Sequence, residues 1–560
     1  LPAGAQVVFE AVRNSNGAQL TDFRHVVSGG NWAMSGDRVR QLPVGELTLT
    51  ATLVTPGRRN ALAKLPVVVT GDDEPDVVFV PWPRGAPVHG PKAPTVARPA
   101  TAQSGEGFPA FAPPSGSRVY YVATGGNDGN DGLSKQRPLK TLRAAYNKLR
   151  DRSSDWVLLQ AGDTFSGGFG GWAKSGASPA SPIHVGVYGE GDRPRIRTNG
   201  DSVLRAQGNV ENIRIEGIHG YANRRLDQTP TSKNIWRESG ITLVGGGRNW
   251  TIQDCKLEGF HFNFIFQGYN GKKIHDINLY RNIVTRSFSH WNGNIGGHSS
   301  GIYAENVHGM EIVECTFDHN GWNPRVSGAQ RTLFNHNIYI QTNSSNVNVR
   351  RSIMARGASH GLQLRPGGEV VDNLFVRNAL GFFVANNPSL VQNNVVLESD
   401  DIGRLDPRGQ GITINPVQSA NVTGNLIANK AGNAAWMHAI YVDPNPSVAA
   451  EGGAFRVHIS NNTVWNWTME SGYAAIDGNR AGSLTGSGNV IDGTDQQTGR
   501  RVVYRDTSVG FDRYVDGGLQ VFIDRAVNRP RGSWEPRFSA TGFNNYMRDG
   551  FTPVSGTGSF

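Results

Sequence analysis

Two short segments near the middle of the chain carry side chains that could move protons, HNIYIQT at 336–342 and HGLQLRP at 360–366. Each begins with a histidine, and a neutral imidazole is a competent base near neutral pH. A tyrosine could donate or relay a proton, and an arginine could bind a carboxylate through two hydrogen bonds. Each histidine also has a structural interpretation, a hydrogen bond to a loop carbonyl. The candidate catalytic residues of these segments are His336, Tyr339, His360 and Arg365.

Glu305 and Asp318 are the carboxylates of the same region. Two carboxylates could hold Ca²⁺ against an acidic ligand, or act as the acid and base of a glycosidase. Their separation cannot be read from the sequence. Both interpretations therefore stay open, with Glu305 as a fifth candidate catalytic residue and Glu305 with Asp318 as a candidate calcium site.

The two segments belong to a series of six in which apolar and other residues alternate. The series is SGIYAEN (300–306), HNIYIQT (336–342), HGLQLRP (360–366), GFFVANN (381–387), GITINPV (411–417) and AIYVDPN (439–445). Successive side chains of a strand point to opposite faces. Alternation therefore sends one column outward, formed by Tyr303, Tyr339, Gln363, Phe383, Thr413 and Tyr441. The neighbouring outward column is Glu305, Gln341, Arg365, Ala385, Asn415 and Asp443. Solvated strands can carry such residues by chance. The alternative is that this face binds a ligand through Tyr303, Gln341 and Gln363.

Two consecutive loops that precede these strands are much longer than the others, RSFSHWNGNIGGHSS at 286–300 and HNGWNPRVSGAQRTLFN at 319–335. Long loops in a repetitive protein usually carry function. Both are rich in His, Trp, Asn and Arg, and aromatic walls beside a polar floor suit sugar rings. Trp291, Trp322 and Arg325 are therefore predicted to bind the ligand.

The elements that must position these residues are indicated by a repeated phrase: hydrophobic, any, polar, polar, any, hydrophobic. Its copies are TIQDCKL, INLYRNIV, EIVECTF, VNVRRSIM, EVVDNLF, SLVQNNVV, NVTGNLI and VHISNNTV, and its fifth column is Cys255, Asn282, Cys315, Ser352, Asn373, Asn394, Asn425 and Asn462, which Asn489 extends. Two strands joined by a polar corner and repeated at intervals of 21 to 37 residues form one rung of a solenoid. Asparagine suits the corner because it tolerates the left-handed region and can bond to the Asn one rung away. The pattern predicts an all-β fold, a right-handed single-stranded parallel β-helix.

Four positions after this corner column stand Arg286, His319, Arg356 and Arg377. Cations stacked at rung spacing repel one another unless an anion lies across them. His319 and Arg356 are therefore predicted to contact an acidic polymer. The alternative is a set of arginines exposed to water at the starts of loops.

The chain divides into four parts. Residues 1–82 alternate as in QVVFEAVR and ELTLTATLVT, which predicts a small immunoglobulin-like β-sandwich that could bind carbohydrate or act as a spacer. Residues 83–117, rich in Pro, Ala and Gly, form a linker. Residues 118–499 form the β-helix, with a capping helix around 141–150. Residues 500–560 are expected to close its far end.

The segment 119–165, with VYYVATGGNDGNDG, PLKTLRAA and GDTF, resembles the entry segment of many bacterial and phage proteins of the pectate-lyase-like β-helix superfamily. The resemblance covers about 118–495. It implies a polysaccharide groove and an activity of the lyase, glycosidase, epimerase or tailspike type. The motifs that would decide among these are mostly absent, with only SHG at 359–361 and Phe317-Asp318-His319 as faint echoes. The GGNDGNDG turn lacks the last acidic residue of a calcium loop and favours a simple turn.

Composition and charge limit the possible partners and the cellular location of the protein. A net charge of +9 and a pI near 9.5 favour polyanionic partners, although solubility alone also accounts for them. No apolar run approaches the length of a membrane span. No export signal opens the chain, so we expect one to have been removed or never to have existed. The two cysteines stand roughly 9–10 Å apart in the corner column, too far to form a disulfide, and so do not reveal the redox compartment.

These observations predict a secreted bacterial enzyme that depolymerises an acidic, uronate-containing polysaccharide, such as an exopolysaccharide, by β-elimination. One alternative is a glycoside hydrolase that acts through Glu305 and Asp318. Another is a non-catalytic adhesin or tailspike that only binds glycans. The expected partner is the polysaccharide and not nucleic acid, and Ca²⁺ is the only cofactor suggested. A monomer is favoured, whereas a tailspike would be a trimer.

Overall fold

A computed structural model describes five strands within residues 6–79 and then residues 111–554, except 228–237, 290–297, 387–388, 403–408, 418, 431–436, 443–455, 470–472 and 479–483. The chain divides into two compact units, Leu1–Pro99 and Ala100–Phe560, and each is described by itself. Among the described helices, none has the length and apolar character that a membrane crossing requires.

The first unit contains an antiparallel sheet in the order β2-β1-β3-β4-β5. Its strands are β1 (Gln6–Arg13), β2 (Gln19–Ser28), β3 (Gly45–Thr55), β4 (Arg58–Val69) and β5 (Val77–Phe79). The described strands form one sheet, and the second sheet that a β-sandwich requires stays a prediction. Residues 83–110 of the predicted linker lie outside the described residues.

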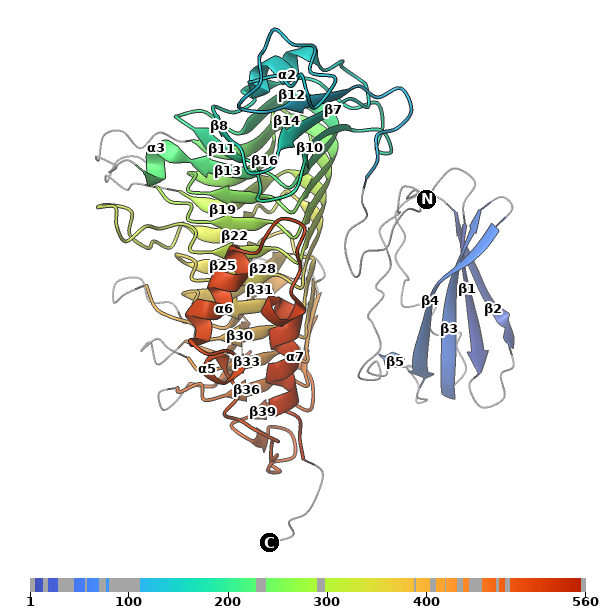
Figure 1. Ribbon diagram of the computed structural model, residues 1–560. Helices are drawn as coiled ribbons and strands as arrows, with labels where there is room; N and C mark the ends of the chain where they lie inside the picture. Colours follow the sequence, from blue (N-terminus) through green and yellow to red (C-terminus); the bar gives the residue numbers. More distant parts are fainter. Residues whose placement is uncertain are drawn as a thin grey trace. The chain divides into compact units, whose positions relative to one another are not determined.

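The second unit is a coil whose rungs each contain three short strands (Figure 1). The first strands of the rungs form one sheet. We call it the floor sheet, because it carries the candidate site. The floor strands are β9 (Gly171–Trp172), β16 (Phe262–Gly268), β19 (Ser300–Glu305), β22 (His336–Ile340), β25 (His360–Leu364), β28 (Leu380–Asn386), β31 (Ile412–Val417), β34 (Ile440–Val442) and β37 (Ile476–Asp477). Two longer strands, β12 (Leu204–Glu216) and β14 (Ser239–Gln253), run on from the floor into the second sheet.

The second and third sheets complete each rung. The second sheet contains β6 (Val119–Val122), β7 (Trp156–Gln160), β10 (Ile183–Tyr188), β17 (Ile274–Tyr280), β20 (Val307–Val313), β23 (Ser345–Arg350), β26 (Glu369–Val371), β29 (Ser389–Gln392), β32 (Ser419–Thr423), β35 (Arg456–Ser460) and β38 (Leu484–Thr485). The third contains β8 (Thr164–Ser166), β11 (Arg195–Thr198), β13 (His219–Ala222), β15 (Lys256–Glu258), β18 (Ile283–Thr285), β21 (Thr316–Asp318), β24 (Ile353–Ala355), β27 (Leu374–Val376), β30 (Val395–Leu397), β33 (Leu426–Ala428), β36 (Thr463–Trp465), β39 (Val490–Ile491) and the antiparallel β40 (Thr494–Asp495). The predicted right-handed parallel β-helix is confirmed.

The core lies inside the coil, as the alternation predicts. Ile302, Ile338, Leu362, Phe382 and Ile412 stack in register along the floor sheet, and each is fully buried. Burying one such side chain contributes about 1.5–3 kcal/mol. Because every rung repeats this stack, the inward positions hold the outward ones at fixed spacing.

The corner between the second and third sheets is built from two adjacent columns. Asparagine was predicted to adopt the left-handed region itself, but the residue before it does so. These residues have φ between 49° and 56° and are Asp254, Arg281, Glu314, Arg351, Asp372, Asn393 and Asn461. The asparagine points inward instead: Asn394 Oδ1 accepts from Asn373 N at 3.0 Å and from Asn373 Nδ2 at 3.1 Å. The predicted bond from rung to rung is confirmed, and the left-handed assignment is wrong by one position.

A second asparagine ladder, which the repeated phrase does not predict, lies between the third sheet and the floor. Asn263 donates to Asn320 at 3.1 Å, Asn320 to Asn337 at 2.9 Å, and Asn337 to Asn378 at 3.0 Å. All four are buried. Asn320 and Asn378 each stand five positions after a corner residue, but Asn263 and Asn337 lie within floor strands, so the four share no single position in the repeat. This ladder fixes the starts of the floor strands, where the candidate histidines stand.

Replacing Asn394 by Ala is expected to lower the free energy of unfolding by about 1–3 kcal/mol. The substitution leaves the backbone N–H and amide of Asn373 without their acceptor. The shift of the urea midpoint measures the effect. Asn147→Ala, on an exposed helical position, serves as the control and should move the midpoint very little. Equal midpoints for both variants would contradict a structural role for the ladder.

The first rung is covered by α2 (Leu142–Lys148), which lies within the range predicted for a capping helix. Leu142 and Ala145 are buried, and Thr141 Oγ1 accepts from Ala144 N. In the GGNDGNDG turn, Asp128 accepts from Lys140 N and Thr141 N, each at 2.8 Å. The aspartate thus fixes the start of the helix.

The C-terminal tail runs back along the third sheet (Figure 1). Its helices are α5 (Phe511–Tyr514), α6 (Gly518–Val527), a 3-10 helix (Pro536–Phe538) and α7 (Ala540–Gly550). Phe522, Phe543 and Met547 join one apolar cluster with Leu374 and Val395 of the third sheet. At the far end, Tyr504 and Phe551 of the tail pack on Trp465 of β36, and Arg501 bridges to Thr494 of the β39–β40 hairpin. Closure of the far end by residues 500–560 stays a prediction. The tail helices cover the third sheet because strands such as LFV and VVL are apolar on both faces and need a cover.

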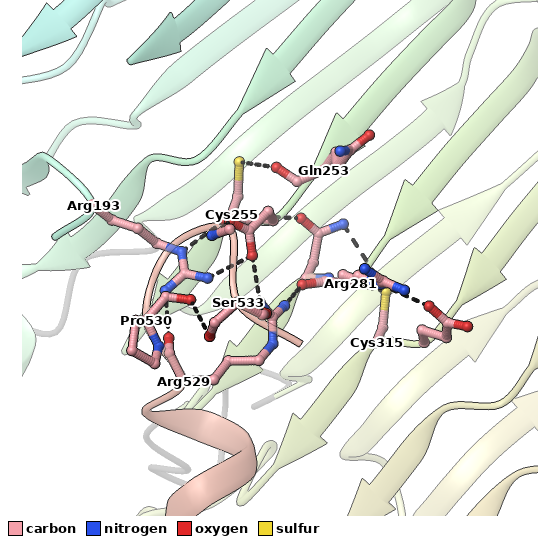
Figure 2. A network of polar contacts seen from close by, with 12 residues as sticks. Arg193, Gln253, Cys255, Arg281, Cys315, Arg529, Pro530 and Ser533 are labelled. Carbon is pink, nitrogen blue, oxygen red and sulfur yellow. Dashed lines mark hydrogen bonds and ion pairs between the residues drawn. The ribbon is translucent and has the colours of Figure 1, made fainter. Parts of the chain in front are cut away.

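A buried ion network fastens the tail to the coil (Figure 2). Asp254 accepts from Arg193 Nη2 at 2.6 Å, from Gly532 N at 2.7 Å and from Arg529. Arg529 also donates to the carbonyl of Arg281. The side chains of Arg193, Asp254 and Arg529 are each at most 10% exposed. One carboxylate therefore balances two buried guanidinium groups from distant parts of the chain.

Candidate active site

The outward column predicted for the floor sheet lies in register. Tyr303 stands opposite Tyr339, and their rings meet edge to face at 5.7 Å. In rung order the column is Tyr303, Tyr339, Gln363, Phe383, Thr413 and Tyr441. Residues far apart in the sequence thus share one face, and aromatic rings recur along it. Asn415 and Asp443 of the neighbouring column lie outside the residues whose side chains are described.

Tyr339 is the centre of the candidate site. Its ring centre lies 5.1 Å from that of His336, and the guanidinium carbon of Arg365 lies 5.2 Å from the same ring. The ring centres of His336 and His360 are 4.8 Å apart. The structure therefore brings the four candidate catalytic residues of these segments together, from β22, β25 and the residue that follows β25.

The four side chains differ in exposure. His336 is 2% exposed and His360 is 7% exposed, whereas Tyr339 and Arg365 are only partly buried. His360 Nδ1 shares a 2.9 Å hydrogen bond with Ser359 Oγ. A ligand on the floor would meet Tyr339 and Arg365 first, with both imidazoles behind them. The sequence does not predict this order, because alternation assigns a face and not a depth.

Glu305 and Gln341 lie beside the two phenols. Glu305 Oε2 accepts from the Tyr303 hydroxyl at 2.8 Å and from Gln267 Nε2 at 2.7 Å. Burial raises the pKa of Tyr303, Glu305 raises it further, and a bond with Gln341 opposes both effects. Burial also raises the pKa of Tyr339, against the charge of Arg365. Both phenols are therefore protonated near neutral pH, and Tyr339 is a potential proton donor beside a cation.

Asp318 lies on the third sheet and not on the floor. Its two carboxylate oxygens accept from Arg356 Nε at 2.8 Å and from Arg356 Nη2 at 2.7 Å. Within the described parts of the chain, no group of three or more His, Cys, Asp or Glu residues could hold a metal ion. Asp318 is thus held by an arginine on another sheet than Glu305, and its calcium role and its pairing with Glu305 stay predictions. A calcium role for Glu305 alone stays a prediction.

The described residues of the two long loops form a wall. Phe288 of the first loop packs with Val326 and Ala329 of the second in a small apolar cluster. Arg331 joins the second loop to Asp400 at 2.8 Å and to the Ala358 carbonyl at 3.1 Å. The second loop therefore has fixed partners beside the floor strands.

The aromatic residues predicted on this wall have different positions. Trp322 donates its indole N–H to the Arg356 carbonyl at 2.9 Å and stacks on His319 at 4.2 Å. Arg325 is exposed, and Trp291 lies outside the described residues. Ligand binding by Trp322, Arg325 and Trp291 stays a prediction.

The basic column at the loop starts has counter-charges within the protein. Each arginine in it pairs with a carboxylate of a neighbouring rung: Arg286 with Glu258 at 3.0 Å, Arg356 with Asp318, and Arg377 with Glu398 at 2.5 Å. Burial lowers the pKa of His319 to about 4, so it is neutral at ordinary pH. Carboxylates, and not a ligand, thus offset the repulsion. The repulsion argument for a ligand at His319 and Arg356 is therefore removed, and their contact with an acidic polymer stays a prediction.

The interactions of Glu258 with its neighbours make the stability of the fold depend on pH. Burial alone would raise the pKa of Glu258, but the His219 hydrogen bond and the charges of Lys256 and Arg286 lower it to about 2. The ionised Glu258 stabilises the fold at pH values above the ordinary carboxyl pKa, because its pKa is lower in the folded state. This contribution is lost as the pH falls towards 2. Its full size is roughly 3 kcal/mol.

Unfolding midpoints at pH 7 and at pH 3 for the wild type and Glu258→Gln would measure this contribution. The wild type is expected to lose more stability on acidification than the variant, because glutamine has no proton to gain. Glu190→Gln, at an exposed position, should follow the wild type. Parallel curves for all three proteins would rule out the proposed role of Glu258.

Two features of the floor were not predicted from the sequence. The Phe262 ring lies 5.8 Å from that of Tyr303 and extends the aromatic row by one rung. At the other end, His438 stacks on Tyr441 at 5.1 Å, and its Nε2 lies 3.5 Å from Asp477 Oδ2. Alternation in HFNFIFQG would instead place Phe262 on the inward face with Phe264 and Phe266, so the sequence offered no signal for its position. No local pattern joins His438 to Asp477.

Residues 203–400 match the family model described as right handed beta helix region, which confirms the superfamily resemblance. Solved structures with a similar chain path include the GH136 lacto-N-biosidase from Eubacterium ramulus, at 14% identity, a TM-score of 0.36, and coverage of 67% of this chain and 68% of that chain. The alginate lyase from Paenibacillus sp. str. FPU-7 shares 12% identity, with a TM-score of 0.32 and coverage of 67% and 99%. The endo-xylogalacturonan hydrolase from Aspergillus tubingensis shares 9%, with a TM-score of 0.32 and coverage of 68% and 94%. No curated protein matches the sequence. Such low identities and TM-scores add no argument about activity.

Proposed function

We propose that this protein cleaves an acidic polysaccharide by β-elimination on the floor sheet. The observation that carries the proposal is the position of Tyr339, a half-buried phenol in contact with both the Arg365 guanidinium and the His336 imidazole. A cation, a proton donor and a base are the three groups that this reaction requires. Rows of aromatic side chains on either side suit stacked sugar rings.

Each group has a role that balances the reaction. Arg365 binds the uronate carboxylate, which makes the neighbouring C–H more acidic. The imidazole pair is the base and acts through Tyr339, which gives its proton to an imidazole as it takes up the carbon-bound proton. The electron pair of that C–H bond forms a carbon–carbon double bond, and the bond to the leaving oxygen breaks. Tyr339 donates the proton taken from carbon to the leaving oxygen and regains its own proton from the imidazolium, so the protein returns to its starting state.

Elimination is favoured over hydrolysis by the environment of the carboxylates. A glycosidase needs two carboxylates on opposite sides of one bond. Asp318 is held by Arg356 on another sheet, and Glu305 is bonded to Tyr303 and Gln267. These separate bonds on different sheets argue against the two carboxylates acting as one pair. The proposal includes secretion and a monomeric state, and sedimentation would test the second.

The test is digestion of a panel of uronate polymers with the purified chain. We expect new ultraviolet absorbance from unsaturated uronate ends, in step with the appearance of shorter chains. Reducing ends without that absorbance would indicate hydrolysis, and retention without cleavage would indicate a binding protein. Either result would overturn the proposed reaction.

The role of the guanidinium can be tested separately with Arg365→Lys and Arg365→Ala. Lysine keeps the charge but cannot bind a carboxylate through two parallel hydrogen bonds. We expect both variants to raise KM and lower kcat, with a larger loss for Ala. An unchanged kcat/KM for Arg365→Ala would remove this residue from the site.

A further inference from the structure

A separate cleft of about 370 Å³ lies at the turn that joins the floor strand β16 to the second-sheet strand β17. It is lined by Asn209, Gly246, Gly247, Arg248, Lys272, Lys273 and His275. None of these residues belongs to the site described above. Three of the seven always carry a positive charge near neutral pH.

The charges in this cleft are poorly balanced. Arg248 pairs with Glu211 at 3.4 Å, but among the described residues no carboxylate forms an ion pair with Lys272 or Lys273. Both lysines are exposed. The arginines at the loop starts behave differently, because each has a carboxylate of its own. Cations held close together without counter-charges attract an anion.

The backbone fixes both lysines in place. The Lys272 carbonyl accepts from Asn306 Nδ2 at 3.0 Å, and the Lys273 carbonyl accepts from Gly247 N at 3.3 Å. A Cβ atom at Gly246 would stand 3.3 Å from Lys272 Cβ, so glycine lets the turn lie directly on β14. The two ammonium groups therefore extend from an anchored turn.

The cleft adjoins the Glu305 end of the floor. Lys272 is bonded to Asn306, the residue that follows Glu305, and Gln267 of β16 bonds Glu305 itself. The charge of Lys273 contributes to a lowered pKa of His308 beside the cleft, after the effect of burial. An acidic polymer that crosses the floor would thus meet a second cationic surface.

We propose that Lys272, Lys273 and Arg248 form a non-catalytic binding site for the carboxylate groups of a polyuronate chain. The identity of the ligand rests on the proposed function, whereas the anion-binding character rests on the cleft alone. The site would hold a part of the polymer that lies beyond the reacting sugar. It would therefore contribute to affinity for long chains.

The test measures binding of the full chain to immobilised polygalacturonate or alginate at low and high salt. The double variant Lys272→Ala with Lys273→Ala is compared with Lys135→Ala and Lys140→Ala, which removes the same charge from exposed lysines near the N-terminal cap. We expect the first pair to bind about three- to tenfold more weakly at low salt, with the difference vanishing in high salt. The control pair should change affinity less than twofold.

Several results would overturn the inference. Equal losses in both double variants would show that only net charge matters. Tighter lysine-dependent binding of a sulfated polysaccharide or of duplex DNA would reject a carboxylate glycan as the ligand. Cleavage assays separate the two proposals: a wild type that binds through the lysines but cleaves nothing loses its proposed reaction and keeps this site. A wild type that cleaves without lysine dependence loses only this site.

Discussion

Replacing Tyr339 by Phe is expected to lower kcat/KM on a uronate polymer about 10²- to 10⁴-fold, the range for loss of a general acid–base group. Phenylalanine keeps the ring that contacts Tyr303, His336 and Arg365. It removes only the hydroxyl, whose proton the proposed elimination uses. The effect should therefore fall mainly on kcat, and the initial rate of formation of unsaturated ends measures it.

Tyr280→Phe is the matched control for this substitution. Tyr280 lies on the second sheet, and its hydroxyl donates to Asn278 Oδ1 at 3.1 Å. This variant also loses one buried phenol, but away from the floor, so its activity should stay near that of the wild type. Full activity in Tyr339→Phe, or equal losses in both variants, would refute the assigned role of Tyr339.

Replacing Asp254 by Asn is expected to lower the free energy of unfolding by about 3–5 kcal/mol, the cost of leaving a buried charge uncompensated. Arg193 and Arg529 would both lose their carboxylate (Figure 2). Burial already lowers the pKa of Arg529 against the attraction of Asp254. Without that attraction the tail should detach from the third sheet more easily. Denaturation midpoints and the rate of proteolysis of residues 500–554 measure the two consequences.

Asp549→Asn provides the comparison for this prediction. Asp549 pairs with Arg505, and both side chains are more than half exposed. Exposed ion pairs contribute about 0–1 kcal/mol. Similar small shifts in the two variants would show that the Asp254 network does not hold the tail.

The features predicted correctly from the sequence are those that repeat. Alternation in HNIYIQT and HGLQLRP places Ile338 and Leu362 inside the coil and Tyr339 and Gln363 on the opposite face of the sheet, where Gln363 is itself buried. The asparagine column repeats once per rung and forms the predicted ladder. A one-position error in the left-handed residue remained, because neighbouring corner residues are all polar and only the inward bonds distinguish them.

The features that sequence reasoning missed depend on contacts between rungs or on the tail. In the sequence, the positive charges of Arg286 and Arg356 lack obvious counter-charges. Their carboxylate partners, Glu258 and Asp318, lie one rung earlier and are therefore far away along the chain. A carboxylate at the end of the preceding third-sheet strand was the available signal for Arg286 and Arg356, whereas the partner of Arg377 is Glu398, one rung later. The bond between Asp254 and Arg529 joins residues 275 positions apart, and no local pattern connects them.

The central claim is that one face of the coil holds the substrate with its carboxylate at Arg365. The most direct test is a crystal structure of Tyr339→Phe soaked with a uronate oligosaccharide. We expect sugar density across Tyr303, residue 339 and Gln363, with one carboxylate bonded to the Arg365 guanidinium. An oligosaccharide bound elsewhere on the coil, with Arg365 free of it, would contradict the account.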